Sequence, residues 1–289
     1  MATSGTATSG TTATEPGDAG TPVPGEPLGT LAACRRYPVK SFQGLDVDEL
    51  SLTTAGVDGD RTHALVERDS GRLLSAKRHS VLLTARADDT ALTLPDGTRV
   101  ALDDPDASAA VSSWLGREVH LTPVSELDET EQLNFEMTFD PPDDSSEYFE
   151  IPGPAGSFLD CAPLHFVTTA TAAACELARP DLDWDVRRFR PNLVLDVDGP
   201  AFVEDAWTGR RLRIGDDAVI EVMMPTVRCA MPLRAQPALG DHAALERQPA
   251  LFAAMNELHE AHPNHFGCYA TVVAPGSVRL GDPVELLPQ

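Results

Sequence analysis

Residues 126–150 contain ten acidic side chains and no lysine or arginine, and two adjacent prolines interrupt this segment. Such a stretch can neither bury its charges nor continue a regular helix, so it predicts a linker or a flexible surface loop. A chain of 289 residues is long enough to form two domains, each with its own core. We therefore expect domains over residues 28–125 and 151–289, joined by an acidic linker over 126–150.

The first 27 residues are almost all alanine, threonine, serine, glycine and proline, and none is aromatic. They hold too little apolar surface to offset the entropy lost on ordering, so a dispensable, disordered tail is expected. The segment lacks the basic and apolar stretches of a secretory signal, and the chain has no run of about 18 apolar residues. These features predict a cytoplasmic protein.

Short strands between turn signals dominate the part over 28–125. Alternating or β-branched runs predict strands at 31–39, 46–53, 63–68, 91–94, 99–102 and 118–123. One helix is expected over 106–114, because Asp106 suits its N-terminal cap and Gly116 its end. The pattern indicates a small, mostly antiparallel β-rich domain.

The part over 151–289 combines strands with two helices. Strands are expected at 164–168, 192–197, 211–214, 218–224, 269–273, 277–280 and 284–287. The helices are expected from Thr169 or Thr171 to Arg179, and over 249–262. The chain is thus mainly β with some α. It has no GxGxxG, phosphate-binding loop or GxSxG motif, which argues against nucleotide-binding and serine-hydrolase functions.

The net charge of −23 disfavours nucleic acid and anionic membranes as partners. The two lysines, Lys40 and Lys77, both lie in short basic clusters, 35–40 and 77–79, and a third basic cluster spans 187–190. One such cluster is usually a solvated surface. Three of them in an acidic chain indicate a site for an anionic ligand.

The five cysteines are scattered and show no CxxC spacing, which argues against a disulfide framework, a zinc ribbon and an iron–sulfur cluster. Cys229 is distinctive because Arg228 precedes it and Arg234 follows shortly after. Nearby guanidinium charge favours the thiolate, which attacks electrophiles and binds soft metals. A packed cysteine at a strand end remains the alternative. Core positions are expected for Cys34, Cys161, Cys175 and Cys268.

Several motifs occur along the chain in the order found in one protein family. They are Tyr37-Pro38-Val39-Lys40-Ser41, Gly59-Asp60-Arg61, Arg188-Phe189-Arg190-Pro191-Asn192, Glu204-Asp205-Ala206-Trp207, Arg228-Cys229, Phe266-Gly267-Cys268-Tyr269 and Gly281-Asp282-Pro283-Val284. This series resembles MOSC-domain proteins that carry the N-terminal β-barrel domain, the group that includes the mitochondrial amidoxime reducing component. The resemblance covers nearly all of residues 29–289. It implies an N-terminal β-barrel-like domain and a C-terminal MOSC β-barrel domain with flanking helices.

The same resemblance implies a molybdenum–pterin cofactor between the two domains. It assigns the binding of the pterin and its phosphate to Lys40, Ser41, Arg61, Arg190 and Asn192. Cys229 matches the family's metal-binding cysteine, and Asp160 aligns loosely with a family aspartate near the metal, which gives both an expected catalytic role. One departure is Ser75-Ala76-Lys77, where the family often reads Thr-Ala-Arg, so a phosphate contact there is expected to change.

The implied function is a molybdenum-dependent oxidoreductase that reduces small N-hydroxylated compounds such as amidoximes and releases the oxygen as water. No ferredoxin-like cysteine set follows the second domain, so a separate electron donor is expected: a ferredoxin, a flavodoxin, or a cytochrome b5-like protein with its reductase. The rival is a sulfur- or cofactor-carrier module that uses Cys229, and pyridoxal phosphate binding is a further alternative.

His259, His262 and His265 could suggest a metal, but cations near a helix C-terminus are favoured without one.

Overall fold

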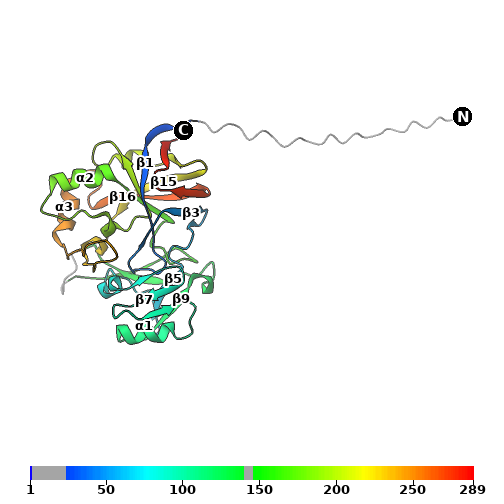
Figure 1. Cartoon of the computed structure of the whole chain (residues 1–289), viewed down its shortest axis with the longest axis vertical. Coiled ribbons are helices and arrows are strands. Elements are labelled where there is room, and N and C mark those ends of the chain that lie inside the picture. Colours follow the sequence, from blue (N-terminus) through cyan, green and yellow to red (C-terminus); the bar gives the residue numbers. More distant parts are fainter. Residues whose placement is uncertain (2–23, 140–145) are drawn as a thin grey trace.

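The computed structural model describes residue 1 and residues 24–139 and 146–289. In this part of the chain, three α-helices accompany a larger number of short strands, which confirms a fold that is mainly β with some α. The strands form two lobes, one carrying β1, β15 and β16 and the other carrying β5, β7 and β9 (Figure 1).

A closed barrel forms the first lobe. Within the described residues its ring consists of β13 (Leu193–Val197), β12 (Leu164–Thr168), β16 (His265–Ala274), β15 (Ala218–Val227), β14 (Arg211–Ile214), β18 (Pro283–Leu286) and β1 (Glu26–Arg36). The pairing of β1 with β13 closes the ring. Side chains alternate between the interior and the outside, as Ala218, Ile220 and Val222 show by pointing into the core. A bulge after Val222 shifts the alternation at the end of β15, just before Arg228 and Cys229.

The barrel takes its first strands from the N-terminal part of the sequence. Strand β1 pairs with both β18 and β13, and β2 (Leu45–Val47) pairs with β1. Strand β3 (Glu49–Thr53) lies between β4 (Gly56–Val57) and β17 (Gly276–Arg279). The tail prediction is wrong for residues 26 and 27, because the edge of β18 offers them backbone partners. Residues 2–23 of that tail lie outside the described part.

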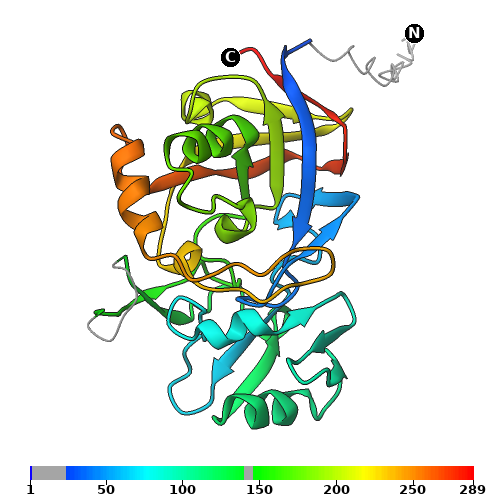
Figure 2. The same ribbon diagram turned by 60° about the vertical axis from the view of Figure 1, so that its left-hand side comes forward.

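The second lobe forms the lower part of the ribbon in Figure 2. It has its own apolar core, around Phe42, Leu82 and Val111. Its elements are β5 (His63–Glu67), η1 (Ser80–Thr84), β6 (Arg86–Ala87), β7 (Ala91–Thr93), β8 (Arg99–Ala101), α1 (Ala107–Leu115), β9 (Val119–Pro123) and η2 (Val124–Glu126). The expected hairpin of β7 and β8 is confirmed. The helix end at Gly116 is confirmed as well, where a φ of 65° suits glycine.

The acidic segment is more ordered than a plain linker. It contains β10 (Asn134–Met137), which pairs with β11 (Phe149–Pro152) to form a hairpin. Phe135 is fully buried in this hairpin and packs against Leu73 and Phe158. The linker prediction is therefore wrong for these strands. Burial of the Phe135 side chain stabilises the hairpin, although the acidic composition of the segment suggested that nothing in it would be buried. Residues 140–145 lie outside the described part.

The remaining helices flank the barrel. They are α2 (Thr169–Ala178), α3 (Ala250–Leu258) and the short η3 (Val186–Phe189), η4 (Val203–Trp207) and η5 (Met231–Leu233). Thr168 caps α2 by accepting a hydrogen bond from the N–H of Thr171, one residue before the expected cap. Helix α3 ends before the expected residue 262, because His259 leaves it to stack on Phe202. Among the described helices, none combines the length and apolar character needed to cross a bilayer.

Candidate functional site

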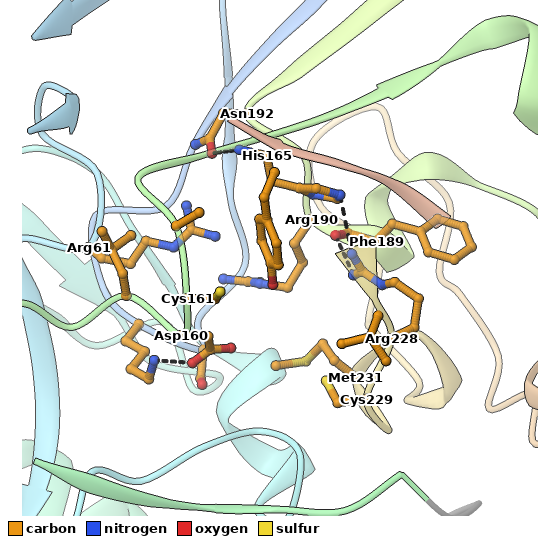
Figure 3. A pocket seen from close by; sticks show the side chains of 16 residues that line it. Arg61, Asp160, Cys161, His165, Phe189, Arg190, Asn192, Arg228, Cys229 and Met231 are labelled. Atoms are coloured by element: carbon orange, nitrogen blue, oxygen red, sulfur yellow. Dashed lines mark hydrogen bonds and ion pairs between the residues drawn. The ribbon is translucent and has the colours of Figure 1, made fainter. Parts of the chain in front are cut away.

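A cavity lies where the two lobes meet, and residues from both halves of the chain line it (Figure 3). Its empty space is about 680 Å³, part of which is open to solvent. The structure brings to this cavity every residue that the sequence analysis assigned to a site: Lys40, Ser41, Arg61, Asp160, Arg190, Asn192 and Cys229. Their roles there remain predictions.

The backbone is strained at this cavity. Among the described residues, five that are not glycine have a positive φ, and three of these line the cavity: Ser41 (69°), Arg61 (48°) and Arg190 (55°). An L-residue in this conformation costs roughly 1–2 kcal/mol, so such residues gather where function requires them. The strain indicates that these turns are shaped to present side chains rather than to maximise stability.

Both lysines of the chain bind the carboxylate of Asp160. Lys40 Nζ lies 2.5 Å from Oδ1, and Lys77 Nζ lies 2.7 Å from Oδ2. Burial would raise the pKa of Asp160, but the two ammonium groups outweigh it and hold this pKa well below its ordinary value. Both carboxylate oxygens are thus occupied. The geometry gives Asp160 the task of holding the two lysines, whereas its predicted catalytic role remains a prediction.

Two guanidinium groups lie against the ring of Tyr37. The Cζ atoms of Arg61 and Arg190 are 4.6 and 4.1 Å from its centre, distances suited to a cation–π interaction. Arg190 also donates a hydrogen bond to the carbonyl oxygen of Phe42, 2.7 Å away, and Arg61 pairs with Asp60. Burial lowers the pKa of Arg190 to about 10, so it stays a cation at neutral pH.

The side chain of Asn192 belongs to the frame of the cavity. Its Nδ2 donates to the carbonyl oxygen of Arg35, and its Oδ1 accepts from the backbone N–H of His165, both at 3.3 Å. These contacts connect β1 to β12. The position predicted to bind a cofactor therefore also ties together two strands of the barrel.

His165 is a member of the site that the sequence analysis missed. Its Nε2 lies 3.2 Å from Nη1 of Arg228, and because arginine only donates, Nε2 accepts and the ring proton sits on Nδ1. Burial and the charge of Arg228 lower the pKa of His165 well below its ordinary value, so the ring is neutral. The available signal was the single titratable side chain within the strand expected at 164–168.

Two thiols line the cavity. Cys229 is half-buried and packs against the apolar core of the second lobe. Cys161 is exposed, so its predicted core position is wrong, because it directly follows Asp160, which the lysines hold beside the cavity. Figure 3 shows Cys161 near Asp160 and Cys229 near Met231. Partial loss of solvent around the thiol and the charge of Asp160 raise the pKa of Cys161. The other three cysteines, Cys34, Cys175 and Cys268, are buried as predicted.

The charge of the lining suits an anion. Four cationic side chains, those of Lys40, Arg61, Arg190 and Arg228, line the cavity with one carboxylate, Asp160. Buried cations are costly unless an opposite charge accompanies them, so the excess positive charge favours a bound anionic group. In an acidic chain, such a gathering is a specific feature rather than a consequence of composition.

The three histidines after α3, His259, His262 and His265, are not arranged as a metal site within the described residues. His259 Nε2 lies 2.7 Å from the carboxylate of Asp205, and its ring stacks on Phe202 with 3.8 Å between centres. Within residues 24–139 and 146–289, no group of three or more His, Cys, Asp or Glu side chains is arranged to hold a metal. These contacts give His259 a packing role.

Comparison with known proteins gives two family matches. Residues 154–285 match the MOSC domain, and residues 28–137 match the MOSC N-terminal beta barrel domain. Human mitochondrial amidoxime-reducing component 1 is 25% identical over 303 residues, which cover 91% of this chain and 84% of that protein. The mouse protein of the same name is 26% identical over 307 residues, with coverages of 91% and 83%.

Two solved structures show a weaker likeness. YuaD from Bacillus subtilis has a TM-score of 0.41 at 11% identity, covering 89% of this chain and 94% of that one. YiiM from Escherichia coli has a TM-score of 0.35 at 15% identity, with coverages of 88% and 70%. Both scores are too low to support a functional inference.

Proposed function

Because the chain is a MOSC-domain protein with an N-terminal MOSC β-barrel domain, similar to the mitochondrial amidoxime-reducing components, we propose that it is an oxidoreductase with a molybdenum–pterin cofactor. Its substrates would be small N-hydroxylated compounds such as amidoximes. The observation that carries this proposal is the cavity itself, where four cationic side chains and the thiol of Cys229 converge beside a single carboxylate.

The residues of the cavity fit the two ends of such a cofactor. Its phosphate is an anion that guanidinium and ammonium groups bind well, and Lys40, Arg61 and Arg190 provide these groups. Its metal is a soft centre that accepts a thiolate, which Cys229 would provide. Ser41 and Asn192 would add polar contacts to the pterin. Because the cationic side chains and the thiol come from different segments of the chain, one cofactor could contact both lobes.

When bound, the cofactor would supply the two electrons that, with two protons, convert an N-hydroxyl group to N–H and water. The chain's own residues have other tasks. Arg228 and His165 form a buried pair beside Cys229 that holds the end of β15 in place. Met231 and Tyr269 give the cavity an apolar surface against which the carbon skeleton of a substrate can pack. The electrons would come from a separate donor: a ferredoxin, a flavodoxin, or a cytochrome b5-like protein with its reductase.

Metal analysis tests the proposal directly. The purified full chain should contain molybdenum and pterin in near-stoichiometric amounts, and it should reduce benzamidoxime to benzamidine with an artificial electron donor. A chain produced in a host that makes the cofactor, but purified without metal and pterin, would contradict the proposal.

A second thiol in the cavity favours the alternative of a sulfur- or cofactor-carrier module. Cys161 lines the same space as Cys229, so a persulfide formed on one cysteine would have a second thiol in its surroundings. This function predicts labile sulfane sulfur, released by cyanide, on a metal-free protein. No comparable observation favours pyridoxal phosphate, because both lysines are paired with Asp160.

A further inference from the structure

Lys77 is fully buried although it does not line the cavity. It is among the largest side chains with almost no exposure, at 1%. Its Nζ lies 2.7 Å from Asp160 Oδ2 and 4.0 Å from the centre of the Phe135 ring. Phe135 belongs to the hairpin of the acidic segment. Burying an ammonium group costs free energy, so we ask what the contact of Lys77 with Asp160 does for the protein.

Lys40 is held by the same carboxylate from the cavity side. Its Nζ donates to Asp160 Oδ1 at 2.5 Å and to the carbonyl oxygen of Phe158 at 2.7 Å. An ammonium group has three N–H donors, and the described residues supply acceptors for two of them. Its Nζ also lies 4.9 Å from the centre of the Phe135 ring, and because Lys40 lines the cavity, the third donor can reach a ligand there.

We propose that Lys77 is a positioning residue, which holds the Asp160 carboxylate in place and through it directs the Lys40 ammonium group toward the ligand of the cavity. Lys77 itself touches neither the cavity nor the ligand. The proposal deepens the proposed function, because the ligand that Lys40 meets is taken to be the anionic cofactor. The relation among Lys77, Asp160 and Lys40, however, can be measured without any ligand.

The three groups are also electrostatically coupled. The pKa of Lys40 is lowered to about 8, chiefly because the ammonium group is buried; the charge of Asp160 raises this pKa, and the charges of Lys77 and Arg61 lower it. Removing the charge of Lys77 should therefore raise the pKa of Lys40. Removing the charge of Asp160 should lower it. A side chain that merely filled space at position 77 would produce neither change.

The composition of the chain makes this measurable, because Lys40 and Lys77 are its two lysines. Full-length protein labelled with ¹³C-lysine should show two Cε signals in an NMR spectrum, and Lys40→Arg and Lys77→Arg variants assign them. The Lys40 signal is then followed from pH 6 to pH 11, within the range in which the fold persists, in the wild type and in the variants.

In Lys77→Met, the Lys40 titration should move to higher pH by roughly one pH unit, the scale expected for one nearby charge. In Asp160→Asn it should move to lower pH. Lys77→Arg retains the charge and should leave the titration near its wild-type position. The matched control is Arg78→Met, which removes a neighbouring cation that pairs with Glu136 and does not touch Asp160. It should leave Lys40 unchanged.

The positioning effect is tested by the binding of inorganic phosphate to cofactor-free protein at pH 7, in the wild type and in the two Lys77 variants, because the change in Lys77→Met is expected to keep Lys40 charged at this pH. Lys77→Met should weaken binding about tenfold, and Lys77→Arg should recover most of it. An unchanged Lys40 titration and unchanged phosphate affinity in Lys77→Met would overturn the proposal. If Lys77→Met fails to fold, an upward shift of the titration in Lys77→Gln decides instead. Shifted titrations in a protein that binds no pterin would leave this inference standing while the proposed function fails.

Discussion

The guanidinium carbon of Arg190 lies 4.1 Å from the centre of the Tyr37 ring, and the hydroxyl of Tyr37 donates to the carbonyl oxygen of Pro191, 3.0 Å away. These contacts join the turn after β1 to the turn after η3. Arg190 thus holds these two turns together and also lines the cavity that we propose binds the cofactor. Substitutions can separate the contribution of the Arg190 backbone from that of its side chain, because its φ is positive.

Replacing Arg190 with alanine or with glycine removes the same side-chain contacts. Glycine adopts the φ of 55° found here without strain, whereas alanine does not. We expect Arg190→Gly to be more stable than Arg190→Ala by about 1 kcal/mol, as measured by urea unfolding. Equal stabilities would show that the positive φ carries no strain. Both variants should lose cofactor to the same extent, since the backbone does not replace the guanidinium group.

Alanine at Lys40 or Arg61 should weaken cofactor retention. Each variant would lose one charge-assisted contact to the cofactor, worth roughly 1.5–3 kcal/mol, and its affinity for the cofactor would fall about ten- to hundredfold. Pterin and molybdenum content after gel filtration is the measurement. Arg211→Ala is the control, because Arg211 pairs with Glu221 on the outside of the barrel. If both variants keep as much pterin as the control, the cofactor does not bind in this cavity.

Cys229→Ser replaces a soft thiolate with a hydroxyl that stays protonated at neutral pH. The variant should keep much of its pterin, because the phosphate contacts come from other segments, and it should lose nearly all reductase activity. X-ray absorption at the molybdenum edge should show one sulfur neighbour fewer than in the wild type. Cys175→Ser, which changes a buried thiol away from the cavity, should leave the metal spectrum unaltered. Identical sulfur counts in wild type and Cys229→Ser would refute the ligand assignment.

His79 should make the fold sensitive to acid. Burial, together with the charges of Arg117 and Arg78, lowers its pKa to about 4. The unfolded chain therefore binds this proton as pH falls below about 6.5, whereas the folded protein does not until about pH 4, so stability is lost across this window. His79→Gln should gain stability relative to the wild type between pH 6.5 and pH 4, by no more than about 3 kcal/mol. The free energies of unfolding in urea of the wild type and of His79→Gln are compared at both pH values. The same difference at pH 6.5 and pH 4 would contradict the prediction.

Much of the local structure was predictable from residue spacing. The hairpin of β7 and β8 follows from alternating side chains around a Pro-Asp-Gly turn, and the end of α1 follows from a glycine that tolerates a left-handed conformation. The residues expected in the site also meet in one cavity. Motif order predicted this meeting, because a family resemblance carries three-dimensional information that spacing alone does not contain.

The sequence by itself determined much of the strand and turn pattern outside the acidic segment, as well as the scarcity of cations and their grouping into three short clusters, because these depend only on neighbouring residues. Only the tertiary structure decided that β1 closes the barrel, that Phe135 orders the acidic segment, and that Cys161 faces the cavity. It also decided that Lys77 lies beneath Asp160 rather than in solvent. The reason is physical: edge pairing, burial and charge neutralisation each require a partner from a distant segment, and the free energy of such contacts exists only once the chain has folded.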